Sequence, residues 1–491
     1  MVSATPSPPS RAFVPVLLFL GGVVSIVSSL GAPLIPRLAE RLHASLGSAQ
    51  WALTATVLVA AVASPLVGRL GDGRHRKRVI VVSLGLVVLG GALAAVSRSL
   101  TLLIVGRALQ GLGLALMPLT MAAAREHLPA ERAARTIAAL SVVGAAGVGL
   151  GYPITGFIAD HGGVGAAYWF GTALCALALA AAIWAIPEPA AIPERRSVDL
   201  LGAALIGLAL VALLIGLDKG ADWGWGSARV LGLITAGVAI GALWTAHELR
   251  TTEPLVDLRL VRHRAVLTAN VAGLLLGVTM YLSMVILSQL VQLPGIGMGE
   301  SVFVAGLTLV PLSIFSASVS RTVPALQRRI GMRAVLPLGS LIVTAAILFF
   351  ALTATQLWQA FVTMGILGIG LGYTFAAMPG LIVGAVPPEE TGSAMGFYQV
   401  SRFVGFALGS GLAITLLHAF SGGADAVPTL SAYRETALVG AGAGLLTAAL
   451  TWWLPGRGAG TAPTREVDAF EVREGELGAA GLEDAEPALS R

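Results

Sequence analysis

The stretch GRLGDGRHRKRV, residues 68–79, is the densest cluster of charged residues in a chain that is otherwise apolar. It separates two apolar runs, near 49–67 and 79–97. Each run has the length of about 20 residues that a helix needs to cross the hydrocarbon core of a membrane. The stretch therefore predicts a short charged loop between two membrane-spanning helices.

The composition of the whole chain supports this interpretation. Of its 491 residues, 56% are hydrophobic and only 12% are charged, whereas a soluble domain averages about 25% charged residues. The net charge is +5, but the cations lie in short loops and form no basic face for nucleic acid. Cys175 is the only cysteine, so neither a disulfide framework within the chain nor a thiolate metal cluster is expected.

Apolar runs of membrane-spanning length recur along the sequence, and their lengths favour helices over barrel strands. The fold class is therefore an all-α integral membrane protein. The first run is too long for the core of a signal peptide and predicts an uncleaved span. The fourteen runs are near 13–35, 49–67, 79–97, 101–123, 136–158, 166–186, 200–217, 229–247, 266–292, 302–322, 334–353, 358–385, 393–417 and 434–454.

The positive charges predict the orientation, because lysine and arginine are retained in cytoplasmic loops. With the N-terminus inside, 23 of the 31 lysines and arginines fall on the inner side and six on the outer side. Both termini are therefore expected in the cytoplasm. The acidic tail from Gly456 onward has no apolar periodicity and is predicted to be disordered.

The loop at 68–79 has an internal echo. RTVPALQRRIGMRAVL, residues 321–336, again places a basic turn with a glycine between two apolar runs. Its position fits two six-span halves related as parallel repeats, a known transporter plan. The alternative is that every inner loop is simply basic. The predicted units are an N-terminal bundle at 12–186, a linker with two extra spans at 187–265, a C-terminal bundle at 266–455 and a cytoplasmic tail at 456–491.

Several motifs resemble those of the major facilitator superfamily, in its fourteen-span drug:proton antiporter branch. GRLGDGRHRKRVI resembles the loop signature G-x-L-a-D-r-x-G-r-k-x-x-l, although Gly73 and His75 depart from it. LIVGRALQGLGLALMP, residues 103–118, is similar to the fourth-span signature R-x-x-q-G. GAAGVGLGYPITGFIAD, residues 144–160, resembles the fifth-span antiporter signature, with the proline one place late. The motifs cover about the first 190 residues, and the rest agrees mainly in architecture.

The resemblance implies a role for the loop as a conformational latch, which forms in one state of the transporter and breaks in the other. The latch residues would be Gly68, Asp72, Arg76 and Lys77. Asp72 precedes a helix, where a carboxylate can accept backbone N–H bonds. The alternative is a solvated topology signal, but retention of positive loops alone has no use for a carboxylate.

Two arginines lie inside predicted spans, where a lone charge is costly and should face the interior or an aqueous cavity. For Arg107, with Gln110 and Gly111, the resemblance implies a role in proton transfer or in organising nearby carbonyls. The alternative is a structural arginine bonded to carbonyls or to Gln110. Arg402 has a similar position, with Gln399 three residues earlier on the same helix face.

In the fifth span, small residues allow close helix packing and a proline bends the helix. The resemblance places this bend at the interface of the two halves, and ordinary packing is the alternative. The residues concerned are Gly147, Gly151, Pro153 and Gly156.

Proton coupling usually needs a carboxylate buried in the membrane, and none occurs at the middle of a predicted span. The first span reads GGVVSIVSSLGAPLIP, with serines where the family commonly has an aspartate. Glu40 and Asp160, at span ends, are the candidate coupling groups. A cavity lining is predicted from amphipathic and aromatic side chains in the spans, with packing as the alternative: Gln50, Trp51, Met117, Asn270, Tyr281, Gln289 and Phe397.

Other functional classes lack their motifs. No G-x-x-x-x-G-K-[ST] surrounds either lysine and no H-E-x-x-H occurs, which argues against an ATP-driven pump and a membrane metalloprotease. PPEE, residues 387–390, is a thin basis for a lipid-modifying enzyme. The prediction is a monomeric exporter of lipophilic, often cationic drugs or antibiotics in the cytoplasmic membrane, driven by protons and without cofactor or metal. A facilitator or symporter that imports a small organic solute is the alternative.

Overall fold

A computed structural model describes residues 11–30, 34, 38, 41–44, 46–71, 75–187, 199–252, 254–261, 263–387, 390–422 and 428–454. These residues form helices joined by short turns, and no β-strand occurs among them. The predicted latch residue Asp72, the candidate acid Glu40 and the predicted tail lie outside the described residues.

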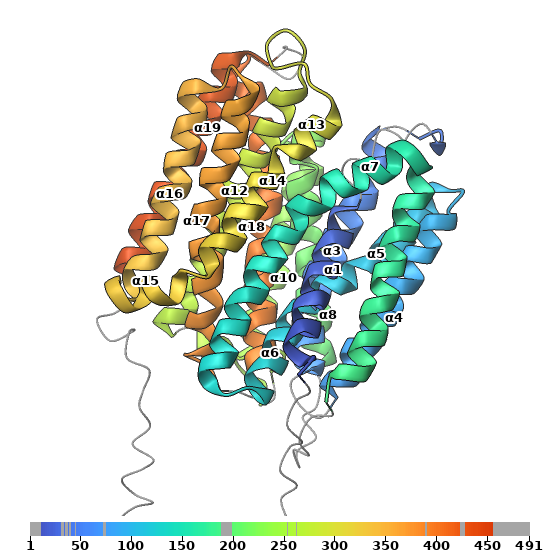
Figure 1. The fold of residues 1–491 in the computed structure, drawn as a ribbon, viewed down its shortest axis with the longest axis vertical. Coiled ribbons are helices and arrows are strands. Elements are labelled where there is room, and N and C mark those ends of the chain that lie inside the picture. The colour runs from blue at the N-terminus through green and yellow to red at the C-terminus, as the bar shows by residue number, and fades with distance from the viewer. Residues whose placement is uncertain are drawn as a thin grey trace, which may run out of the picture.

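The first helices pack on one another as an N-terminal group (Figure 1). They are α1 (Phe13–Ser29), α3 (Leu46–Leu70), α4 (Arg76–Val96), α5 (Leu100–Leu114), α6 (Met117–His127) and α7 (Ala130–Ala185). The predicted run 101–123 is divided between α5 and α6, because Pro118 at the start of α6 has no backbone N–H to continue the helical hydrogen bonds.

Helix α7 is two helices joined end to end. Its 56 residues would extend for about 84 Å at the usual helical rise, far more than the roughly 30 Å hydrocarbon core. The chain bends at Gly163, where φ is 78° and ψ is 171°, a conformation that only glycine adopts without strain. Figure 1 shows the two limbs of α7 on either side of this bend.

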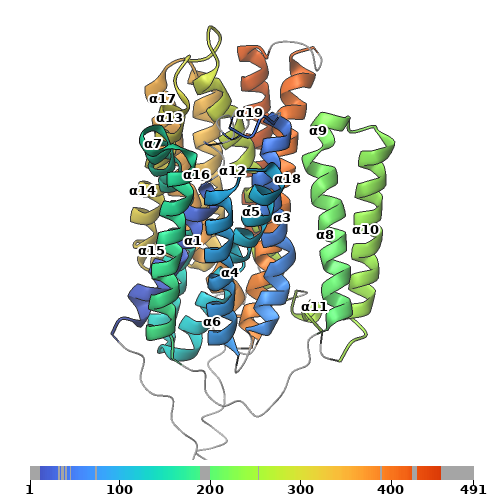
Figure 2. The ribbon, with the colours of Figure 1, turned by 90° about the vertical axis from the view of Figure 1, so that its right-hand side faces the viewer.

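Two long helices follow and stand as a pair at the edge of the molecule (Figure 2). This linker pair comprises α8 (Leu200–Asp218) and α10 (Ala228–Glu248), with the short helices α9 (Gly220–Trp223) and α11 (Leu258–Val261) beside them. α8 contacts α3 and α18, so the pair covers one side of the junction between the other helices.

The remaining helices form a C-terminal group. They are α12 (Arg264–Gln292), α13 (Val302–Leu307), α14 (Leu309–Ser320), α15 (Val323–Ile330), α16 (Met332–Thr353), α17 (Leu357–Val383), α18 (Thr391–Phe420) and α19 (Leu430–Trp453). The predicted run 302–322 is broken at Thr308, close to Pro311, which cannot donate a helical hydrogen bond. α3 and α6 contact α18, and α7 contacts α14 and α17, so these helices join the two groups.

Twelve helices of the described residues are long and apolar enough to cross a membrane. They correspond to twelve of the fourteen predicted runs; the runs 13–35 and 136–158, in α1 and the first limb of α7, are not among them. Many large apolar side chains face outward, including Trp184, Leu352 and Trp453, each at least three-quarters exposed. Such an apolar exterior suits contact with lipid rather than with water.

Candidate transport site and the junction between the helix groups

Arg107 on α5 is completely buried and serves as a hydrogen-bond centre for three helices. Its Nε donates to the carbonyl of Ala52 on α3 at 3.3 Å, and its Nη1 donates to the carbonyl of Val27 on α1 at 3.2 Å. Nη1 also donates to Oε1 of Gln110, one helical turn away, at 2.8 Å. Because several acceptors surround it, this guanidinium is well satisfied within the N-terminal group.

Gly111 lies beside this network, where α5 crosses α3. A Cβ at this position would collide with the carbonyl oxygen of Thr56. The hydroxyl of Thr56 in turn donates to the carbonyl of Arg107 at 3.1 Å. A residue larger than glycine would therefore separate the two helices that hold Arg107.

The two helix groups meet at the end of the molecule formed by the α3–α4 junction, the α6–α7 turn and α15. We call this the basic end. Arg69 at the end of α3 pairs there with Glu390 before α18, at 3.3 Å, and the two side chains are 4% and 16% exposed. Arg125 on α6 donates to Thr391 Oγ1 at 2.5 Å and to the carbonyl of Val386 at 3.0 Å. Both arginines thus connect the N-terminal group to the α17–α18 turn.

Backbone contact accompanies these polar contacts. A Cβ at Gly68 would lie 2.6 Å from the carbonyl oxygen of Gly392, and a Cβ at Gly396 would lie 2.7 Å from that of Ser64. α3 and α18 therefore approach each other as closely as their backbones allow, over one turn at the basic end. In this conformation the two groups are closed on each other there.

Arg76, another predicted latch residue, contacts its own helix group. Arg76 is buried; its Nε donates to the carbonyl of Gly71 at 2.9 Å, and its Nη1 forms an ion pair with Glu126 on α6. Lys77 is half-buried next to it. Arg76 thus fixes the α3–α4 junction against α6, whereas Arg69 and Arg125 reach the C-terminal group.

The predicted antiporter glycines lie along the first limb of α7. A Cβ at Gly147 would lie 2.6 Å from Cβ of Ser25, so α7 packs closely on α1 there. Gly151 is buried, Pro153 is inside the helix, and Gly156 lies near Phe303 of α13. Their predicted role as a bend at the junction stays a prediction. The side chain of Asp160 is outside the described residues.

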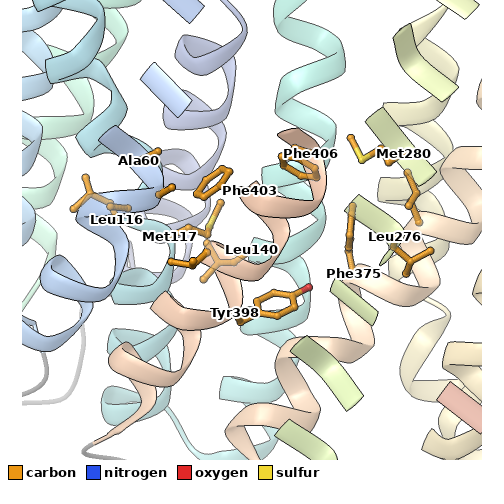
Figure 3. Packing of buried hydrophobic residues seen from close by; sticks show 14 of the residues in the cluster. Ala60, Leu116, Met117, Leu140, Leu276, Met280, Phe375, Tyr398, Phe403 and Phe406 are labelled. Atoms are coloured by element: carbon orange, nitrogen blue, oxygen red, sulfur yellow. The ribbon is translucent and has the colours of Figure 1, made fainter. Parts of the chain in front are cut away.

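A cavity of about 70 Å³ lies between the two groups. It is bounded by α1, α5, α6 and α7 on one side and by α12, α17 and α18 on the other. Figure 3 shows aromatic and methionine side chains gathered in this region. The lining residues are Val24, Ser25, Leu114, Met117, Met121, Ser141, Gly144, Met280, Tyr281, Phe375, Pro379, Tyr398, Gln399, Arg402, Phe403 and Phe406.

Of the side chains predicted to line a cavity, Met117 and Tyr281 line the one between the helix groups. Asn270 instead accepts a hydrogen bond from Ser401 at 2.8 Å, Gln289 is exposed, and Phe397 stacks on Trp244 of the linker pair.

Trp51 lies at the other end of α3, with Nζ of Lys219 5.6 Å from its ring centroid. The side chain of Gln50 is not among the described residues. Trp51 is not among the residues that line the cavity between the helix groups.

Arg402 on α18 is the only charged residue among the cavity-lining residues. Its Nη1 donates to Oε1 of Gln399 at 2.9 Å. Its guanidinium carbon lies 4.3 Å from the ring centroid of Phe375, 5.5 Å from that of Phe406 and 5.8 Å from that of Tyr398. The charge is thus surrounded by aromatic faces rather than by carbonyls.

Acidic side chains are found elsewhere. Glu248, at the end of α10, is the only buried acidic residue in the described part of the chain, and it does not line the cavity. His247 beside it contacts Asp199 at the start of α8 at 2.7 Å. These residues hold the ends of the linker pair together.

The sequence was compared with models of known protein families, and the match fits an all-helical protein with two helix groups. A family model described as Major Facilitator Superfamily matches residues 17–410 and, in a second match, 325–482. The chain belongs to the major facilitator superfamily. It is therefore a multi-pass membrane transporter rather than an enzyme.

Several relatives in this superfamily are named for export or drug resistance. A tetracenomycin C resistance and export protein of Streptomyces glaucescens is 30% identical over 465 residues, which cover 89% of this chain and 83% of that protein. A probable actinorhodin transporter of Streptomyces coelicolor is 28% identical, with 86% and 75% covered. A multidrug resistance protein B homolog of Mycobacterium tuberculosis is 26% identical, with 82% and 76% covered.

Solved structures support the fold alone, since their sequences are distant. The human organic anion transporter MFSD10 matches with a TM-score of 0.62 at 18% identity, covering 91% of this chain and all of that one. The peptide-family transporter PepTSo also matches with a TM-score of 0.62, at 15% identity, covering 91% and 98%.

Sequence reasoning missed the residues that join the two groups of this superfamily member. Arg69 lies inside the quoted loop motif but at one of its variable positions. Glu390 lies in PPEE, a stretch that carries no local signal for an ion pair. The two are 321 positions apart, and no local pattern relates them. The contact of Arg402 with Phe375 was missed for the same reason, since Phe375 comes from another helix, whereas Tyr398 and Phe406 lie one turn before and after Arg402 on α18.

Proposed function

We propose that this transporter exports lipophilic drug-like or antibiotic-like molecules across the cytoplasmic membrane by alternating access. The similarity to the tetracenomycin C resistance and export protein carries the proposal, because it extends over 89% of the chain rather than over one motif. The apolar lining of the cavity between the helix groups supports a lipophilic cargo, since few polar groups interrupt it.

The proposed topology has fourteen spans. α1 and the first limb of α7 would cross the membrane in addition to the twelve apolar helices, giving six spans in 12–186, two in the linker 187–265 and six in 266–455. The distribution of lysine and arginine supports an orientation with both termini and the basic end in the cytoplasm. Arg69, Arg125 and Arg329 all lie at that end.

The described conformation would then be closed toward the cytoplasm. A cavity of about 70 Å³ is too small for a drug-sized ligand, whose pocket typically needs about 300–1,000 Å³. Loading from the cytoplasm would require α3 and α6 to separate from α18, which breaks the Arg69–Glu390 and Arg125–Thr391 contacts. In this proposal the latch is the loop at 68–79, with Gly68 and Arg69 in the contact and Asp72, Arg76 and Lys77 ordering the loop behind it.

The proposed energy source is the proton gradient. Glu40 and Asp160 remain the candidate coupling groups at the span ends, and the Arg107 network would organise the helix surfaces near α1. Arg107 holds α1, α3 and α5 together through one guanidinium. A change in that network would therefore reach three helices at once.

The test uses inverted membrane vesicles that contain the protein, with a proton gradient imposed acid inside. Accumulation of a panel of lipophilic fluorescent dyes, neutral, cationic and anionic, is followed for wild type and for Asp72→Asn and Arg107→Ala. Uptake that an uncoupler abolishes, and that both variants lack, is expected. Arg98→Gln, which removes an exposed charge elsewhere, should transport normally. If well-folded wild type moves none of the dyes, export of this kind is the wrong function.

A further inference from the structure

We propose that the cavity between the helix groups binds an aromatic organic anion, and that Arg402 holds its negative charge. This inference rests on the proposed function and specifies its cargo. It departs from the sequence-based expectation of an often cationic cargo.

The surroundings of Arg402 leave its charge without an anionic partner. Among the described residues, the guanidinium has one hydrogen-bond acceptor, Oε1 of Gln399, and its buried Nε has none. No carboxylate in the described part of the chain lies within ion-pairing distance of it. A guanidinium has five N–H donors in a planar fork that matches a carboxylate, sulfonate or phenolate. Arg402 lines the cavity, so a partner that enters the cavity meets a guanidinium with unused donors.

Arg107 shows how this fold satisfies an arginine whose neighbours are all protein. That guanidinium meets the carbonyls of Ala52 and Val27 as well as the side chain of Gln110. It is fully buried and is not among the residues that line the cavity between the helix groups. Arg402 likewise contacts a glutamine three residues away, here Gln399 on the N-terminal side, but none of the carbonyls. The difference indicates that Arg402 is placed for a partner that enters the cavity.

The rings around Arg402 favour a flat aromatic partner. Tyr281 stacks on Phe406 with centroids 4.4 Å apart, and Phe403 meets the edge of Phe406 at 5.9 Å. Figure 3 shows Phe403 and Phe406 with Tyr398 and Phe375 in this region. Aromatic pairs of this kind and the nearby Met117 can exchange partners with a fused ring system at little cost. The cation–π contacts also hold the guanidinium in place until an anion arrives.

Charge argues against a cation in the same place. None of the lining residues is acidic, and the buried Glu248 lies on the linker helix α10. A cation would meet Arg402 across a water-poor cavity, where like charges repel strongly. An aromatic anion gains both the ring contacts and the charge.

The test compares two dyes that share a xanthene ring system, sulforhodamine B, which carries a net negative charge, and rhodamine 6G, which is cationic. Binding is measured by fluorescence anisotropy with purified protein in detergent micelles, and transport is measured separately in inverted vesicles. Wild type should bind sulforhodamine B more tightly than rhodamine 6G. Arg402→Gln should weaken binding of the anion at least about 10-fold, as expected for loss of a charged hydrogen bond.

Further variants separate charge from structure. Arg402→Lys keeps the charge and should keep the preference for the anion. Gln399→Glu places a carboxylate at hydrogen-bond distance from Arg402 with little change in volume, and it should remove the preference. Arg329→Gln deletes an exposed positive charge on α15 and should leave the binding of both dyes unchanged.

The outcomes distinguish the two proposals. If wild type binds and transports rhodamine 6G in preference to sulforhodamine B, the anion inference is overturned while drug export stands. If sulforhodamine B binds in an Arg402-dependent way but is not transported, the anion inference stands and the proposal of drug export is overturned. If sulforhodamine B does not bind, or binds equally to Arg402→Gln, the inference is overturned.

Discussion

The pair between Arg69 and Glu390 offers a direct test of how the basic end closes. Glu390→Gln keeps the shape of the side chain and removes its charge. In the closed conformation this change leaves Arg69, with a side chain only 4% exposed, beside a neutral amide. In a conformation with the basic end open, both residues would be in water, where the loss matters little. The substitution should therefore destabilise only the closed conformation.

The size of the effect follows from the burial of the pair. Loss of one partner from a fully buried ion pair costs about 3–5 kcal/mol. Glu390 keeps 16% of its side chain exposed and the oxygen lies 3.3 Å from the arginine nitrogen, so about 2–3 kcal/mol is expected here. This shifts the ratio of closed to open molecules by about 30- to 150-fold.

Pulsed electron paramagnetic resonance can measure this ratio. Arg132→Cys on α7 and Arg328→Cys on α15 place spin labels on exposed positions at the basic end, one in each helix group. The native Cys175 is fully buried and is replaced by alanine. The wild-type background should show mainly the shorter label distance, and Glu390→Gln should show mainly the longer one.

Two further variants decide the interpretation. Glu131→Gln removes a carboxylate whose pair with Arg135 is exposed, and it should leave the distances unchanged. The exchange Arg69→Glu with Glu390→Arg should restore the short distance in part. A distance distribution for Glu390→Gln identical to wild type, or an exchange no better than the single change, would refute the reasoning.

Three other predictions concern packing and local structure. Gly68→Ala places a Cβ 2.6 Å from a carbonyl oxygen of α18 and should lengthen the same label distance at the basic end. Arg107→Ala removes charged hydrogen bonds to α1 and α3 and should lower the free energy of unfolding in detergent by about 3 kcal/mol or more. Gly163→Ala forces alanine into a conformation reserved for glycine and should cost about 1–3 kcal/mol in the same measurement.

Matched controls are available for each. Gly85→Ala adds a Cβ where no atom lies within 4 Å, so it should be neutral or slightly stabilising in a helix. Arg98→Ala removes an exposed arginine and should leave the unfolding free energy near wild type. Equal losses for Gly163→Ala and Gly85→Ala would contradict the argument from backbone conformation. A stable Arg107→Ala would contradict the role given to its hydrogen bonds.

The sequence predicted the helices well, because a membrane span is a local property. Each apolar run needs only its own 20 or so residues to be helical, and twelve of the runs are found as apolar helices of spanning length. The breaks after Leu114 and at Thr308 were not predicted. Both lie in continuous apolar runs, where the effect of Pro118 or Pro311 depends on whether neighbouring helices satisfy the freed carbonyls. The bend at Gly163 was also not predicted, because only its backbone angles reveal it.

In the candidate site, too, the sequence predicts contacts within one helix but not contacts between distant segments. The contacts of Arg107 with Gln110 and of Arg402 with Gln399 join residues three apart on one helix, and helical periodicity alone brings them together. Tyr398 and Phe406, four residues before and after Arg402, follow from the same periodicity, but Phe375 and the partner of Arg69 come from distant parts of the chain. Their positions depend on how the two helix groups dock, which a single sequence does not encode in any local pattern. The functionally distinctive contacts are therefore those that only the tertiary structure supplies.

An anionic cargo would also change the energetics of export. A membrane potential acts on every charge that crosses, by about 2.3 kcal/mol per elementary charge for each 100 mV. In a cell whose interior is negative, this force drives an anion outward but holds a lipophilic cation inside. Exchange of a cation for protons usually relies on a buried acid, whereas an exporter of anions gains from the potential in addition to the proton gradient. The serines in the first span and the acid-free lining of the described cavity, with Arg402 as its one charge, are consistent with the second case.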